Sequence, residues 1–151
     1  MKLDDALGAL GRRMGVAGLA FNAEGVCRMV FDGRHVIDCE RCGETGQQQA
    51  YLYSVIARQP AEGREALYQR LLAANLFGRE TGDAVLALDA VAGEVLLQQK
   101  FDAEGLTEDA FATLVERFVD RVEHWSDALA QVAAPQDHPN GMDPGAAMLR
   151  V

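Results

Sequence analysis

The stretch from Leu71 to Asp89, LLAANLFGRETGDAVLALD, constrains the fold of this chain more than any other. Apolar residues with helical spacing lead into Gly78, a polar turn follows, and residues 84–88 then have the composition of a short strand. Glycine adopts the left-handed conformation that ends a helix without strain. The stretch therefore predicts an abrupt helix-to-strand joint. It also carries more apolar surface than a small domain easily hides, which favours a protein that binds other chains.

Length and composition predict one self-sufficient domain. A chain of 151 residues buries roughly 70% of its unfolded surface on folding, so it needs no disulfide or metal to hold it together. Three cysteines make a poor disulfide framework. No apolar run approaches the roughly 20 residues that cross a bilayer. The start of the chain, MKLDD, has acids where a signal peptide has its basic region. We therefore expect a cytoplasmic protein with no membrane segment.

The charge narrows the range of partners. The net charge is −9 and the pI is near 4.7. Phosphates and anionic membrane surfaces would be repelled by such a chain unless it had a strong local basic patch. The balance disfavours nucleic acid and membranes as partners and suits basic or amphipathic protein segments.

The first half of the chain predicts a helix and then strands. Leu3, Leu7, Leu10 and Met14 share one face of a helix that Gly15 ends. Short apolar runs separated by turn residues follow. They predict a short extended run at residues 18–22 and then three full strands at 26–31, 35–40 and 50–57, with a polar loop over 41–49. We expect a three-residue loop at 32–34, because it sets Met29 opposite Ile37 and Cys27 opposite Cys39, whereas a two-residue loop pairs nothing well.

The second half predicts a helix, two strands and a long helix. The helix over 61–77 has a broad apolar face, which indicates that two surfaces cover it. The strands at 84–88 and 95–101 are apolar on both faces. Thr107 is a good N-cap for a helix running to about Val132, and the run from 133 to 151, rich in Pro, Gly and Ala, predicts a disordered tail. We thus expect one domain over 1–132, of class α+β with the order α-β-β-β-α-β-β-α.

Reactive motifs are sparse. Cys39 and Cys42 form a CxxC pair, and Cys27 with His35 would complete four zinc ligands or a thiol redox site. The pair follows a strand into a polar loop, however, and not into the helix N-terminus that activates a redox thiol. The sequence shows no Ser–His–acid arrangement, and no phosphate-binding loop, because the Gly78–Gly82 turn lacks the Lys-Ser/Thr pair. We expect ordinary thiols, no catalysis, no metal and no cofactor, and we keep a zinc- or thiol-dependent protein as the alternative.

The order of elements and the joint resemble a known family. Residues 3–130 are similar to the class I chaperones of bacterial type III secretion, the CesT/SycE-like family. The most specific part of the resemblance lies in and around the joint, with the hairpin turn Phe31-Asp32-Gly33 in addition. The residues of that part are Leu72, Asn75, Leu76, Phe77, Gly78, Thr81, Gly82, Leu86, Leu88 and Gly93.

The resemblance implies a homodimer with a twisted antiparallel sheet in each subunit. It implies that the second helix and the strand after it meet their mates across the two-fold axis, which gives five interface candidates: Leu67, Leu71, Leu76, Val85 and Ala87. It further implies that the N-terminal segment of a secreted effector wraps, extended, around the dimer without ATP and is later taken over by the secretion ATPase complex. The residues implied to receive it are Leu3, Leu7, Leu10, Phe21, Val26 and Phe31. A regulatory member of the family, which sequesters an anti-activator, fits the same residues.

Overall fold

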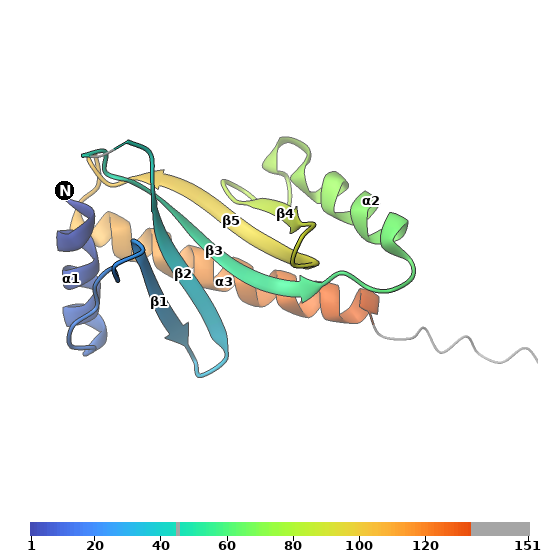
Figure 1. The fold of residues 1–151 in the computed structure, drawn as a ribbon, viewed down its shortest axis with the longest axis horizontal. Coiled ribbons are helices and arrows are strands. Elements are labelled where there is room, and N and C mark those ends of the chain that lie inside the picture. The colour runs from blue at the N-terminus through green and yellow to red at the C-terminus, as the bar shows by residue number, and fades with distance from the viewer. Residues whose placement is uncertain (45, 134–151) are drawn as a thin grey trace, which may run out of the picture.

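The computed structural model describes residues 1–44 and 46–133, so the predicted tail lies outside the described residues. The described residues form one five-stranded antiparallel sheet with helices around it (Figure 1). The class α+β and the predicted order of elements are confirmed. In that part of the chain, no helix has the length and apolar character required to cross a membrane. In chain order the elements are α1 (Leu3–Met14), β1 (Val26–Phe31), β2 (His35–Cys42), β3 (Gln49–Arg58), α2 (Arg64–Asn75), the 3-10 turn η1 (Leu76–Gly78), β4 (Val85–Asp89), β5 (Glu94–Asp102) and α3 (Glu108–Ala133).

The sheet has the strand order β1-β2-β3-β5-β4, and α3 crosses one of its faces (Figure 1). The helix begins where the side chain of Thr107 accepts a hydrogen bond from the N–H of Ala110 at 3.1 Å, as its N-cap role predicts. Its apolar face, which includes Phe111, Phe118 and Trp125, is fully buried. The core therefore lies between α3 and the sheet, and α1 closes it at one end.

The β1–β2 hairpin has the predicted register. Cys27 lies opposite Cys39, and Met29 lies opposite Ile37. The loop spans 32–34, and the N–H of Arg34 donates to the carbonyl of Phe31 at 3.1 Å. Arg28 and Asp38, also opposite one another, form two hydrogen bonds of 2.8 and 2.7 Å. Cross-strand matching thus identified the loop length correctly.

Residues 18–22 are not a strand, which corrects the sequence prediction. Gly18 has a φ of 75°, which an extended strand excludes. The side chain of Asn22 then accepts hydrogen bonds from the N–H groups of Glu24 and Val26. This turn fixes the chain direction into β1, and the apolar run before it is an irregular segment.

Three element boundaries also differ from the prediction. Strand β2 continues to Cys42, where a loop was expected. The second helix starts at Arg64 and not at 61, because Gly63 before it has a φ of 72°. It ends as an α-helix at Asn75, since Phe77 and Gly78 both have left-handed backbones. The joint after the helix is thus as abrupt as predicted, but it takes two left-handed residues to make it.

Candidate protein-binding surfaces

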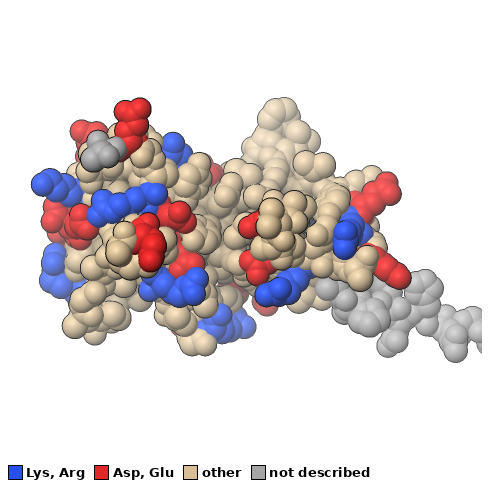
Figure 2. All heavy atoms as spheres, in the orientation of Figure 1, with Lys and Arg blue, Asp and Glu red and all other residues tan. Residues whose placement is uncertain are grey.

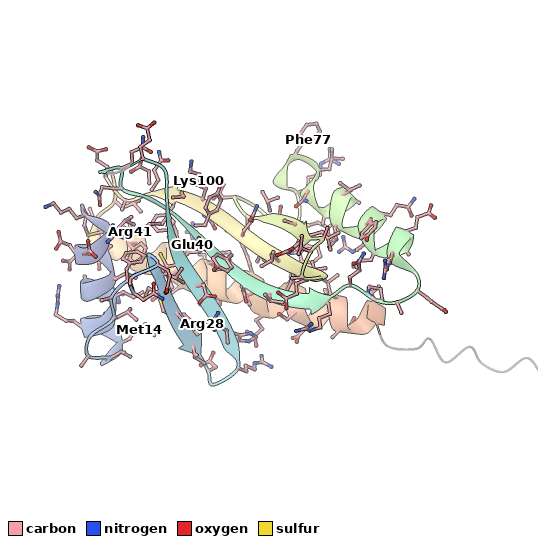
Figure 3. The ribbon with its side chains drawn as sticks, viewed as in Figure 1. Met14, Arg28, Glu40, Arg41, Phe77 and Lys100 are labelled. Atoms are coloured by element: carbon pink, nitrogen blue, oxygen red, sulfur yellow. The ribbon has the colours of Figure 1, made fainter. Side chains whose placement is uncertain are left out.

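Two groups of exposed apolar side chains lie at opposite ends of the molecule. One end, which we call the α1–β1 surface, has Met14 as the last residue of α1, Val16 just after it, and Val30 and Val36 on the hairpin. The other, the α2–β4 surface, has Leu72, Leu76, Phe77 and Val85. Met14 and Phe77 mark these ends in Figure 3. Figure 2 shows acidic and basic side chains mixed over the α1–β1 end, whereas the tip above α2 is free of charged atoms in this view.

The helix of the α1–β1 end keeps its apolar face for its own subunit. Leu3 and Leu7 are 0% exposed, and Leu10 is buried as well. Of the residues that the resemblance assigns to an effector, these three lie in the core, and Phe21, Val26 and Phe31 are half-buried. The free apolar surface at this end therefore comes from β1 and from the segment that leads into it.

Strand β1 forms one edge of the sheet. It pairs with β2 on one side, and the described residues contain no strand on its other side. Arg41 fixes the neighbouring segment: its guanidinium lies 4.1 Å from the ring centroid of Phe21 and 2.6 Å from a carboxylate oxygen of Asp4. The backbone groups of such an edge are a template for pairing with another extended chain.

The sheet face opposite α3 carries a polar row and, further along β3 and β5, the apolar pair Val55 and Leu96. Glu40, Tyr51 and Lys100 lie in one row across β2, β3 and β5, and Figure 3 shows Glu40 and Lys100 on this part of the sheet. A hydrogen bond from Arg28 to Asp38 raises the pKa of the Arg28 guanidinium, which holds its charge beside β1. An extended segment lying along β1 would thus meet aliphatic and charged groups together.

The α2–β4 surface is organised by Asn75. Its side-chain amide donates to the carbonyl of Leu86 and its amide oxygen accepts from the N–H of Leu86, both at 2.9 Å. The side chain thereby pairs with the strand as another peptide group would, at the free edge of β4. This clamp fixes the end of α2 against the sheet.

A shallow apolar hollow of about 290 Å³ lies between α2 and β4. The residues that line it are Tyr68, Leu71, Leu72, Asn75, Leu86, Ala87 and Leu88. Among the implied interface residues, Leu67 and Leu71 are buried under α2, Leu76 and Val85 are exposed, and Ala87 lies half-buried in the hollow. Of the five, Leu71 and Ala87 line this hollow, while Leu67, Leu76 and Val85 do not.

Phe77 was missed as an interface candidate by sequence reasoning. Its side chain is 87% exposed, and its neighbour Leu72 is 72% exposed. The available signal was the position of Phe77 directly before Gly78, at the point where the helix must turn away. The role of Asn75 had no such signal, since it depends on backbone atoms eleven residues later.

The three cysteines do not converge on one site, because Cys27 and Cys39 are neighbours in the core but Cys42 does not join them. Side chains alternate along a strand, so Cys39 and Cys42 face opposite sides of β2. Burial raises the pKa of Cys39 to about 12 and also raises that of Cys27, so both stay protonated thiols at neutral pH. Over residues 1–44 and 46–133, His, Cys, Asp and Glu form no group of three or more that could hold a metal ion. This geometry disfavours the zinc or redox alternative.

Comparisons with known proteins agree with this architecture. The model of the Tir chaperone protein (CesT) family matches residues 5–126. A Chlamydia pneumoniae protein is 38% identical over 72 residues, 48% of this chain and 54% of that relative, so the match spans about half its length.

Similar solved structures include the ExsC–ExsE complex, with a TM-score of 0.68 at 20% identity over 84% of this chain and 96% of that one. The Yersinia pestis type III secretion chaperone SycH, in complex with a fragment of YscM2, has a TM-score of 0.62 at 18% identity over 82% and 99%. The HopA1–SchA chaperone–effector complex has a TM-score of 0.62 at 19% identity over 82% and 89%. The chain belongs to the Tir chaperone protein (CesT) family and has the fold of the type III secretion chaperones.

Proposed function

We propose that this protein is a cytoplasmic type III secretion chaperone that binds the N-terminal segment of a secreted protein and keeps it extended. The observation that carries the proposal is the free edge of β1, flanked by exposed apolar side chains, in a chain of this family. An added strand would gain main-chain hydrogen bonds from β1, and its alternate side chains would enter apolar sites beside it. The net charge of −9 favours a basic or amphipathic segment.

The proposed activity is binding alone. Keeping a segment extended needs neither ATP nor a chemical step, because apolar contacts and strand pairing supply the free energy. The segment is released when the secretion ATPase complex takes it over. A regulatory partner, such as an anti-activator, would be held by the same edge, which is the second form of this proposal. The complexes solved for similar folds support the binding of a protein partner, and one of them, HopA1–SchA, is a chaperone–effector complex, which supports the first form.

We further propose a homodimer formed through the α2–β4 surface. Leu72, Leu76 and Val85 are exposed there, and an apolar patch of this kind on a soluble chain marks an interaction site. The dimer leaves β1 of each subunit free at the far end, so that two segment-binding edges are presented. A mass of about twice 16.3 kDa in solution is the expected result.

Purification from the native bacterium, with mass spectrometry of what co-purifies, tests the chaperone proposal. The expected partner is a secreted protein whose N-terminal segment becomes protected from protease in the complex. Val30→Asp places a charge beside the β1 edge and should weaken that complex at least tenfold, whereas Val91→Asp, at a fully exposed turn residue away from β1, should not. The absence of any secreted or regulatory partner while the secretion system is active contradicts the proposal.

A further inference from the structure

Phe77 has a backbone conformation that its side chain disfavours. Its φ is 54° and its ψ is 25°, in the left-handed region that bulky residues rarely adopt. Phe77 is 87% exposed, and the Arg79 guanidinium lies 5.8 Å from its ring centroid. Figure 3 shows the ring at the tip of η1, directed away from the rest of the fold. Strain that displays an aromatic ring to solvent gains the isolated subunit nothing, and such strain is found where residues function.

The joint around Phe77 holds this conformation in place. Before it, the Asn75 side chain is bonded twice to Leu86. After it, the N–H of Gly82 donates to the carbonyl of Gly78 at 2.8 Å. The ring is therefore presented from a fixed base and does not hang from a flexible loop. A preorganised aromatic of this kind loses little conformational entropy on binding, which is what an interface anchor requires.

The hollow between α2 and β4 is the complement of this ring. Its volume of about 290 Å³ exceeds the roughly 150 Å³ of an apolar cavity that accepts benzene. Its walls are Leu71, Leu72, Leu86 and Leu88, and Phe77 of the same chain is not among them. One surface thus carries a projecting ring and an apolar hollow that this ring does not line.

Two-fold symmetry makes this combination self-complementary. In a dimer with a two-fold axis, residue i contacts residue j and residue j contacts residue i, so a projection and a hollow on one surface are both used twice. Copies of a chain with a net charge of −9 repel each other. They can approach most easily where acidic side chains are sparse, and the face of the tip seen in Figure 2 shows none, while the charge beside the ring is the positive Arg79 guanidinium. Both arguments favour a second copy of this chain over an extended segment as the occupant.

We propose that Phe77 of each subunit inserts into the α2–β4 hollow of a second copy of this chain and anchors the dimer. The proposal rests on the homodimer proposed above and names the residue that would decide its affinity. It also assigns Ala87 a specific part, because a small side chain at that position keeps the hollow open.

Phe77→Asn separates an anchor from a merely structural residue. Asparagine tolerates the left-handed backbone, so the variant removes the ring and relieves the strain together. We expect the dimer dissociation constant to rise at least about 30-fold, as for a hot-spot residue. The denaturation midpoint of the monomer should stay equal or rise. Val91→Asn, at an exposed valine outside η1 and the hollow, is the matched control and should change neither quantity.

Ala87→Trp tests the hollow with the ring intact. The indole should fill the hollow from within its own subunit and weaken the dimer as Phe77→Asn does. Mixed together, the two variants have one intact contact, because the Ala87→Trp subunit keeps its ring and the Phe77→Asn subunit keeps its hollow. We therefore expect the heterodimer to be tighter than either variant homodimer by at least about 10-fold, measured by native mass spectrometry or sedimentation.

The outcomes separate this proposal from the one on which it rests. A wild-type monomer at micromolar concentration overturns the proposed homodimer. A wild-type dimer that Phe77→Asn leaves unchanged, or a heterodimer no tighter than the variant homodimers, overturns the anchor alone. If Phe77→Asn keeps the dimer but loses the secreted partner, the ring contacts that partner, and the anchor proposal is again wrong.

Discussion

The helices α1 and α2 have similar apolar content but differ in how much of it is buried within the subunit. In α1 the leucines Leu3, Leu7 and Leu10 all point into the core of their own subunit. In α2, Leu67 and Leu71 do the same, but Leu72 is 72% exposed and Leu76, directly after the helix, is half exposed. An apolar stripe therefore shows which residues share a helix face, while the width of the stripe shows whether a second surface is available. The narrow apolar stripe of α1 is buried within its own subunit, whereas part of the wide stripe of α2 stays exposed.

The strongest test of this comparison is a pair of identical substitutions, Leu7→Ala and Leu72→Ala. Leu7 is fully buried, so its truncation leaves a cavity and should lower the free energy of unfolding by about 2–5 kcal/mol. Leu72→Ala should cost the monomer no more than about 0.5 kcal/mol. Urea denaturation at a protein concentration at which the chain is monomeric measures both losses. Equal losses would show that α2 is as well covered within one subunit as α1.

A second pair compares the asparagine at each end. Asn75→Ala leaves the N–H and the carbonyl of Leu86 unpaired in a partly buried place and should cost about 1–3 kcal/mol. Asn22→Ala removes two bonds to exposed N–H groups that water can replace, and should cost about 1 kcal/mol or less. Thermal unfolding with calorimetry compares them. A larger loss of stability for Asn22→Ala than for Asn75→Ala would mean that the turn into β1 is more strongly fixed than the joint before β4.

The third test concerns how completely water is excluded from the core around Cys39. Burial raises the pKa of Cys39 from 9.0 to about 12, so the thiol of the unfolded chain ionises first as the pH rises. The stability that Cys39 contributes is therefore complete below pH 9 and is lost between about pH 9 and 12, by at most about 1.4 kcal/mol per pH unit.

Denaturation of the wild type and of Cys39→Ala from pH 8.5 to 10 measures this contribution. The variant should show the shallower dependence on pH. Equal slopes for the two proteins would show that water reaches Cys39.

The features predicted correctly from the sequence are those determined by residues that are close together in the chain. The hairpin register followed from a turn and from the residues directly across it, and the start of α3 followed from Thr107 alone. The strand expected at 18–22 was wrong because the composition of an apolar run does not reveal whether a partner strand lies beside it. The burial of Leu3 and Leu7, two of the residues that the resemblance assigns to an effector, depends on how α1 packs on α3 and the sheet. Those contacts join residues about a hundred positions apart.

The Asn75 clamp has a consequence for the kind of assembly this protein can form. A sheet with two open edges can recruit strands at both ends and grow into a fibre. Here the N–H and the carbonyl of Leu86, the second residue of the short edge strand β4, are already bonded to a side chain of the same subunit. An added strand is thereby hindered at β4, whereas the described residues place no such clamp on β1. An acceptor of extended chains needs this asymmetry, because it must accept one foreign strand without becoming a template for its own copies.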